Sequence, residues 1–266
     1  MNQLPDRWEK LYTGLNTGLR GEASQAVNRE ATEPRTQEGL VETLYSDIRA
    51  MAVDFRLRPG ERVNEVALSR ALNASRTPLR EALNRLVAEG FLTFESGKGF
   101  FCRTYSVTEI QDLYQLRQAI ERFAVQLAVE RASDGALAEL GRFLDRTAGE
   151  EGRSPEELLA WDEHFHETIA DLAGNAELLR TLGNINARIR FFRWVDMESR
   201  RGRTQGEHRA ILSAIAARDA TSASALMDGH IVRRREEIAR AVRECHARLF
   251  ADEDYRTPEF KTMDEL

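Results

Sequence analysis

Hydrophobic positions divide the chain into two patterns that meet near residue 106. Between residues 38 and 105, three runs of helical spacing are followed by two short runs typical of strands. From 106 to 249 the spacing is helical throughout, and Gly, Asn and Pro divide it into about six segments. The flanking residues, 1–37 and 250–266, are polar and show little periodicity. We therefore expect a mainly α protein with two folded domains, 38–105 and 106–249, between a flexible arm and a mobile acidic tail.

The first domain has the element order of a winged helix-turn-helix. A first amphipathic helix is followed by a second that Asn64 is placed to cap, and Ser75 is placed to cap a third. The third helix ends at Gly90, where glycine accepts a left-handed backbone. Two strands, 91–94 and 100–103, follow it and are joined by a turn that contains glycines, which predicts a hairpin wing.

The third helix separates an apolar face from a polar one that carries arginines. Arginines near the N-terminus of such a helix can reach guanine edges or phosphates in the major groove, and free backbone N–H groups there can bind phosphate. A merely solvated helix face is the alternative, and the complete order of helix, turn, recognition helix and wing disfavours it. The predicted DNA contacts are Ser75, Arg76, Thr77, Arg80, Asn84, Arg85, Gly97 and Lys98.

Charge and composition narrow the classes of partner. The net charge is −6, but residues 41–105 carry ten Lys and Arg against eight Asp and Glu, so this segment is near +2 and the rest near −8. No stretch is apolar enough to span a membrane, and the N-terminus lacks the pattern of a signal peptide. The two cysteines, Cys102 and Cys245, are far apart and are interpreted as free buried thiols. These features favour a cytoplasmic, nucleoid-associated protein with no membrane partner.

Histidines mark the second domain. Of the five in the chain, His166, His208 and His230 fall on apolar stripes, where an unpaired polar group is costly to bury. Asp162 stands one helical turn before His166 and shares its face. One carboxylate and three imidazoles from three helices of a bundle would form a transition-metal site. Taken singly, each histidine is more often a core residue with its hydrogen bonds satisfied.

Both domains carry the motifs of known families. The run Asn73-Ala-Ser-Arg-Thr-Pro-Leu-Arg-Glu-Ala-Leu83, with Leu57-Arg-Pro-Gly-Glu-Arg-Val63 before it and Glu89-Gly-Phe-Leu92 after it, resembles the winged helix of GntR-type regulators. The second half resembles the FCD ligand-binding domain in its short, six-helix form. The matching pieces are Asp112-Leu-Tyr-Gln-Leu-Arg117, Asp162-x-x-Phe-His166, Glu207-His208-x-x-Ile211 and Asp228-Gly-His230-Ile231. One departure is Val66, where some relatives carry a DNA-contacting arginine, so operator affinity or sequence is expected to differ from theirs.

The resemblance assigns roles to several side chains of the second domain. It implies that the metal ligands are Asp162, His166, His208 and His230, with zinc preferred and nickel or manganese as alternatives. It also implies that Arg117 faces a cavity and holds an anionic effector, because a guanidinium grips a carboxylate bidentately. The alternative for Arg117 is an ion pair with Glu121 one turn on. Second-rank candidates for the effector site are Arg188 and Arg190.

We therefore expect the protein to be a homodimeric regulator without catalytic residues. Family members bind pseudo-palindromic, double-stranded operator DNA as dimers, and repression relieved by a small anionic metabolite is their commoner behaviour. The alternative hypothesis is an enzyme that activates water at the metal. No general base, phosphate-binding loop or nucleophile–base pair stands beside the histidines in the sequence, so we expect no enzyme activity. A purely structural metal remains a third possibility.

Overall fold

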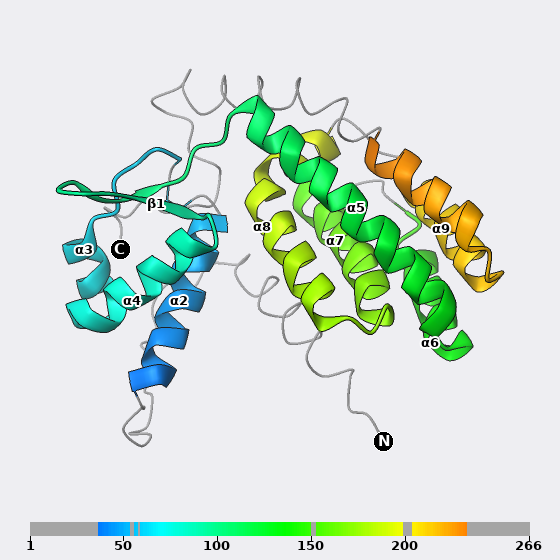
Figure 1. Ribbon diagram of the computed structural model, residues 1–266, viewed down its shortest axis with the longest axis horizontal. Coiled ribbons are helices and arrows are strands. Elements are labelled where there is room, and N and C mark those ends of the chain that lie inside the picture. The colour runs from blue at the N-terminus through cyan, green and yellow to red at the C-terminus, as the bar shows by residue number, and fades with distance from the viewer. Residues whose placement is uncertain (1–36, 54–55, 58, 150–152, 199–203, 233–266) are drawn as a thin grey trace. The chain divides into compact units, whose positions relative to one another are not determined.

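The computed structural model describes residues 37–53, 56–57, 59–149, 153–198 and 204–232. The predicted tail and nearly all of the predicted arm lie outside these ranges, as does Cys245. Within them the chain is mainly helical, as predicted (Figure 1). No helix in the described ranges is both long and apolar enough to cross a membrane.

In the described residues the winged helix-turn-helix consists of three helices and a hairpin (Figure 1). Its elements are α2 (Gln37–Val53), α3 (Glu65–Ala71), α4 (Arg76–Ala88), β1 (Leu92–Glu95) and β2 (Gly99–Cys102). The strands pair antiparallel with Leu92 opposite Cys102, so β1 begins one residue later than predicted and β2 one residue earlier. Gly97 and Gly99 in the wing have φ angles of +78° and +100°, a conformation that glycine adopts without steric cost.

Local signals at the helix ends behave largely as the sequence predicts. The Asn64 side chain accepts a hydrogen bond from the backbone N–H of Ala67 and caps α3. Gly90 follows α4 with φ +84°, the predicted left-handed position. Ser75 occupies the N-cap position of α4, but its side chain makes no capping hydrogen bond, which corrects the predicted cap. The Ser75 hydroxyl therefore keeps its hydrogen-bonding capacity at the exposed end of α4.

The core of this domain comes from the apolar stripes of all three helices and from the inner faces of the strands. Leu44 and Ile48 of α2 pack with Leu83 and Leu86 of α4 and with Phe100 of β2, all nearly inaccessible to water. With these stripes buried, the polar face of α4 is left to solvent, as the helical period requires. Packing of the first helix and the hairpin thus fixes which face of α4 is available to a partner.

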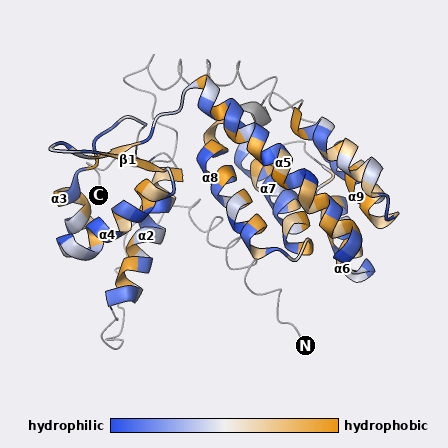
Figure 2. Cartoon of the chain, in the orientation of Figure 1, coloured by the Kyte–Doolittle hydropathy of each residue, from blue (hydrophilic) through white to orange (hydrophobic). Residues whose placement is uncertain are grey.

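The second domain is a bundle of amphipathic helices (Figures 1 and 2). They are α5 (Val107–Arg131), α6 (Asp134–Arg146), α7 (Pro155–Leu172), α8 (Ala176–Glu198), α9 (Thr204–Ala216) and a helix at 220–232. Two of these helices begin with capping boxes, Ser106 with Glu109 at α5 and Ser154 with Glu157 at α7. The helices enclose an apolar core that includes Phe165, whose ring contacts the imidazoles of His166 and His208.

Candidate metal centre and DNA-binding face

The exposed side of α4 carries most of the predicted DNA contacts. Ser75, Arg76 and Thr77 are exposed at the N-terminal end of α4, and Asn84 is exposed further along the helix. At the wing tip Gly97 is also exposed. Side chains on one exposed helix face and at an exposed hairpin tip have the arrangement that a winged helix needs to reach a groove and a neighbouring phosphate.

The other three predicted contacts are engaged within the domain. Arg85 donates a hydrogen bond to Glu42 at 2.7 Å and lies 4.1 Å from the ring centroid of Tyr45, so α2 already holds it. Arg80 is 3.7 Å from Glu65, and Lys98 is 2.8 Å from Glu95. Exposed ion pairs of this kind contribute little and can open for a phosphate. Arg80 also lies over an aromatic ring, 5.5 Å from the centroid of Phe100, as Arg85 does over Tyr45 at the shorter distance.

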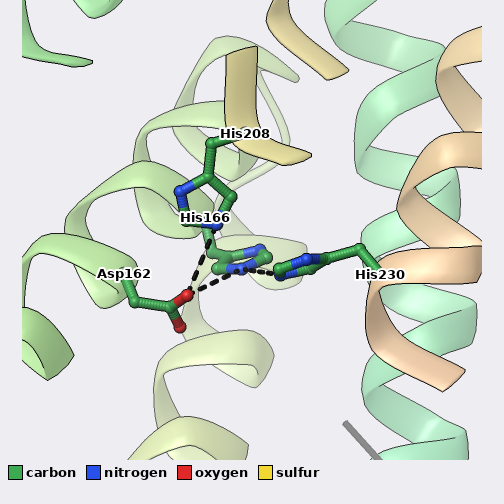
Figure 3. A group of neighbouring side chains, drawn as sticks. All are labelled: Asp162, His166, His208 and His230. Carbon is green, nitrogen blue, oxygen red and sulfur yellow. Dashed lines mark hydrogen bonds and ion pairs between the residues drawn. The ribbon is translucent and has the colours of Figure 1, made fainter. Parts of the chain in front are cut away.

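The four predicted metal ligands converge at one point in the bundle (Figure 3). Asp162 and His166 come from α7, His208 from α9 and His230 from the helix at 220–232. One ligand atom from each lies within 4.8 Å of the others, and all four residues are buried. Ligand bonds of ~2.0–2.2 Å would need only small inward shifts of these side chains. One oxygen and three imidazole nitrogens suit zinc, nickel or manganese.

Two carboxylates, the buried Glu121 and the partly exposed Glu207, orient two of the histidines. Glu121 of α5 accepts a hydrogen bond from His166 Nδ1, and Glu207 of α9 accepts one from His230 Nδ1 at 2.6 Å. With the proton on Nδ1, each ring presents an unprotonated Nε2. These two Nε2 atoms face each other at 3.2 Å, so two lone pairs are held together in the core. A cation between them would relieve that repulsion, and the pair therefore fits a metal ion.

His208 is oriented by a ring contact in place of a carboxylate. Its imidazole stacks on Phe165 at 3.9 Å between centroids and 14° between planes. Neither ring nitrogen has a hydrogen-bond partner among the residues that the structure describes, although both are buried. Nε2 lies 3.4 Å from Asp162 Oδ1, on the side of the other ligands. A buried imidazole left unsatisfied in this way is costly unless it binds a ligand or a metal.

Arg117 and Glu121 form a buried pair that extends to the first histidine. The Arg117 Nε–H donates to Glu121 Oε1, both side chains are only about 2% exposed, and the second oxygen of Glu121 accepts from His166. Burial acts to raise the pKa of Glu121, but Arg117 and His166 outweigh it and lower this pKa to about 2. Burial lowers the pKa of His166, so this imidazole is neutral near pH 7 and able to bind a metal. Arg117 Nη2 is buried and has no partner among the described residues.

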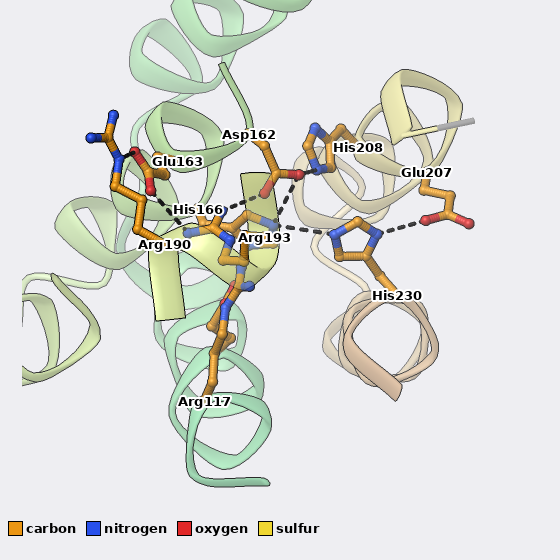
Figure 4. Close-up of polar contacts among 10 residues, drawn as sticks. Arg117, Asp162, Glu163, His166, Arg190, Arg193, Glu207, His208 and His230 are labelled. Atoms are coloured by element: carbon orange, nitrogen blue, oxygen red, sulfur yellow. Dashed lines mark hydrogen bonds and ion pairs between the residues drawn. The ribbon is translucent and has the colours of Figure 1, made fainter. Parts of the chain in front are cut away.

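A second buried arginine, which the sequence analysis missed, holds Asp162 (Figure 4). The Nη2 group of Arg193 in α8 donates to Asp162 Oδ2 at 2.5 Å, and its Nη1 donates to Glu163 at 3.2 Å. Burial opposes its charge, but the anions of Asp162 and Glu163 outweigh burial and raise the pKa of Arg193. The available signal was a single charged residue within the apolar run Phe191-Phe192-Arg193-Trp194. The contact of Glu207 with His230 was missed as well.

The second-rank effector candidates differ in position. Arg190 lies 3.5 Å from Glu163, which also contacts Arg193, so it borders the cluster (Figure 4). Arg188 instead donates to the hydroxyl of Tyr105, in the segment before α5, and is not brought to the four ligands. Of the predicted effector residues, Arg117 is the one with an unpartnered donor in the buried cluster.

Comparisons with known proteins match two regions of the chain. Residues 40–102 match the family described as bacterial regulatory proteins, gntR family, and residues 112–233 match the FCD domain. The Nta operon transcriptional regulator of Aminobacter aminovorans is 45% identical over 193 residues, which cover 73% of this chain and 91% of that protein. The transcriptional repressor GlaR of Escherichia coli K12 is 29% identical over 66% of this chain and 84% of its own length.

Solved structures agree on the fold. The Escherichia coli protein McbR/YncC aligns with a TM-score of 0.62 at 23% identity and covers 77% of this chain and 98% of its own. A GntR regulator from Rhodococcus sp. RHA1 gives 0.63 at 23% identity over 76% of this chain and 98% of that one. Two family models match the chain, and the Aminobacter aminovorans regulator is similar to it over most of that protein's length. The chain therefore belongs to the GntR family of transcriptional regulators, which are not enzymes, and carries an FCD domain.

Proposed function

We propose that this regulator is a homodimeric repressor whose affinity for operator DNA changes when a small carboxylate metabolite binds beside a divalent metal ion. The observation that carries the proposal is the pair of Nε2 atoms of His166 and His230, 3.2 Å apart, with both Nδ1 atoms bound to carboxylates. Asp162 and His208 complete the ligand set. A bound zinc, nickel or manganese ion would supply positive charge and coordination positions for an anion.

Charge in the cluster favours an anionic effector. Arg117 and Arg193 are balanced by Glu121 and Asp162, so these buried groups are neutral together before any metal binds. A divalent ion adds two positive charges, and Glu207 offsets one of them. A monocarboxylate would remove the remainder. Arg117 Nη2, a buried donor with no hydrogen-bond partner among the described residues, could donate to it.

The effector can control DNA binding only if it binds two arrangements of the bundle with different affinities. The ligands come from α7, α9 and the helix at 220–232, so an anion that changes how they are held biases the packing of those helices. Such an effector can shift the equilibrium only by the ratio of its affinities for the two arrangements. Repression relieved by the effector follows if the liganded arrangement no longer matches the spacing of the operator half-sites.

A stripe on α5 supports the homodimer. Leu116 and Phe123 stand two turns apart on one face of α5, and about half of each side chain is exposed. Ile120, between them, is partly buried. Apolar residues at this spacing form the seam by which two helices pack side by side, and a pseudo-palindromic operator calls for two copies of the same chain.

The proposal is tested by thermal unfolding against a panel of small carboxylates, each with and without EDTA. A ligand at 100 times its Kd adds ~2.7 kcal/mol, which raises Tm by several degrees. We expect at least one acid to stabilise the protein only when metal is present, and the same acid to release DNA selected from a random-sequence library. In Arg117→Gln the stabilisation should vanish, whereas the exposed Arg122→Gln on the same helix should respond like the wild type. An unchanged response in Arg117→Gln would refute the anion site.

A structural metal is the second candidate, and the number of protein ligands favours it. Four protein ligands, Asp162, His166, His208 and His230, can close a tetrahedral site by themselves, as structural zinc sites do. His230→Ala separates the two roles. A structural ion predicts a large fall in Tm, whereas a sensory ion predicts a folded, DNA-binding protein that no longer responds to the effector.

A further inference from the structure

The two carboxylate oxygens of Asp162 have different neighbours, and Arg193 binds one of them. Its Nη2 group donates to Oδ2 at 2.5 Å, and both side chains are 3% exposed, so the bond is shielded from water. Glu163, the next residue of α7, accepts a hydrogen bond from Nη1 of the same guanidinium at 3.2 Å. With one donor on each carboxylate, the guanidinium is held at two points and has little freedom to turn.

The other oxygen of Asp162 faces the histidines. Oδ1 is 3.4 Å from His208 Nε2 and 3.8 Å from His166 Nε2 (Figure 3). The side chain therefore offers one oxygen to the ligand cluster while its second oxygen is bound to Arg193 on α8. Figure 4 shows the Arg193 guanidinium beside Asp162, across from the imidazole of His208.

The number of oxygens that a carboxylate gives to a metal decides how many positions remain for other ligands. Carboxylates bind cations through one oxygen or through both, and the second oxygen occupies a position that an exogenous anion could take. An aspartate whose second oxygen is free can move between these modes. Asp162 is restrained from doing so by a short, charged hydrogen bond in a low-dielectric interior, where such bonds are strong.

We propose that Arg193 is a positioning residue that keeps Asp162 a one-oxygen ligand and so reserves a coordination position for the effector carboxylate. This inference rests on the proposed metal centre. Arg193 then acts on effector binding through Asp162, without contacting the effector. It raises the affinity for the effector carboxylate, because loss of its hydrogen bond lets the second oxygen of Asp162 compete for the same position.

The test uses the full chain loaded with Co²⁺, with acetate as the probe. The d–d absorption of Co²⁺ weakens as the coordination number rises, so it reports the binding mode directly. In the wild type we expect acetate to change this spectrum in a saturable titration. In Arg193→Met, which keeps the volume but has no donor, we expect a weaker spectrum before acetate is added and an acetate affinity lower by roughly tenfold or more.

Two further variants keep the result interpretable if Arg193→Met does not fold. Arg193→Lys keeps the charge, but a single ammonium cannot reproduce the two-point contact with Asp162 and Glu163, so acetate affinity should again fall. Arg180→Gln is the matched control, because Arg180 lies on the same helix in an exposed pair with Glu177. Its spectrum and acetate affinity should equal those of the wild type.

The outcomes separate the two proposals. If the wild type binds no Co²⁺, the metal centre is refuted and the role of Arg193 falls with it. If the wild type binds Co²⁺ and acetate but the folded Arg193 variants show the same spectrum and affinity, the metal centre stands and the positioning role is wrong. A weaker spectrum and reduced acetate affinity in the Arg193 variants, with Arg180→Gln unchanged, supports both.

Discussion

Replacing Glu121 by Gln tests how the buried charges of the bundle depend on one another. In the wild type Arg117 is 1% exposed, and Glu121 is the ion-pair partner that the structure gives it. Glu121→Gln removes that negative charge and leaves the guanidinium, which cannot lose its proton, buried without compensation. Breaking a buried pair in this way costs about 3–5 kcal/mol of unfolding free energy.

Replacing the other member of the pair, Arg117, should lower the free energy of unfolding less. In Arg117→Met the carboxylate of Glu121 still accepts from His166. Arg117 lowers the pKa of His166 while Glu121 raises it, so without Arg117 this imidazole is protonated more easily and can balance the anion. We expect a cost of about 1–2 kcal/mol, in the range for a disturbed buried hydrogen bond.

Urea unfolding followed by circular dichroism at pH 7 in EDTA measures both costs without a contribution from metal binding. At that pH Glu121 is ionised, because its folded pKa is about 2. The thermal midpoint of Glu121→Gln should fall by roughly ten degrees. Equal costs for the two substitutions, or a cost below about 1 kcal/mol for Glu121→Gln, would show that Arg117 does not depend on Glu121 and refute the reasoning.

Three further predictions concern other parts of the chain. Arg76→Ala should weaken binding to selected operator DNA by about 1–3 kcal/mol in fluorescence anisotropy, whereas Arg85→Ala should change it little, since Arg85 is already held within the domain. Hydrogen bonds from Ser106 and Arg103 lower the folded pKa of Glu109 to about 2. The ionised Glu109 therefore stabilises the fold above the usual carboxyl pKa, and this stabilisation is lost as the pH falls toward 2. At pH 6 the free energy of unfolding of Glu109→Gln should be about 1 kcal/mol lower than that of the wild type. In urea titrations this difference should shrink toward pH 3. Phe123→Glu should give a monomer in light scattering, and an intact dimer would exclude the α5 stripe as the seam.

Local features of the fold were predictable because they depend on neighbours in the chain. The capping box of Ser106 and Glu109 is formed by residues three apart, and Gly90 terminates α4 through its own backbone freedom. Each strand was predicted one residue further from the turn than the structure has it, because the pairing extends to Glu95 and Gly99 beside the turn. Ser75 was placed correctly before α4, but whether its hydroxyl bonds to the helix was not fixed by position.

The sequence alone determined the order of elements and the polar face of α4, because helical period is a property of consecutive residues. The four candidate ligands were named from their resemblance to the FCD motifs, and the structure brings them together. Only the tertiary structure decided how those residues are used. Glu121 and His166, or Asp162 and Arg193, lie tens of residues apart, and helix packing brings each pair into hydrogen-bond contact. Burial then sets their charge states, since a low-dielectric interior tolerates a charge only beside its partner, and that partnership is a property of the fold.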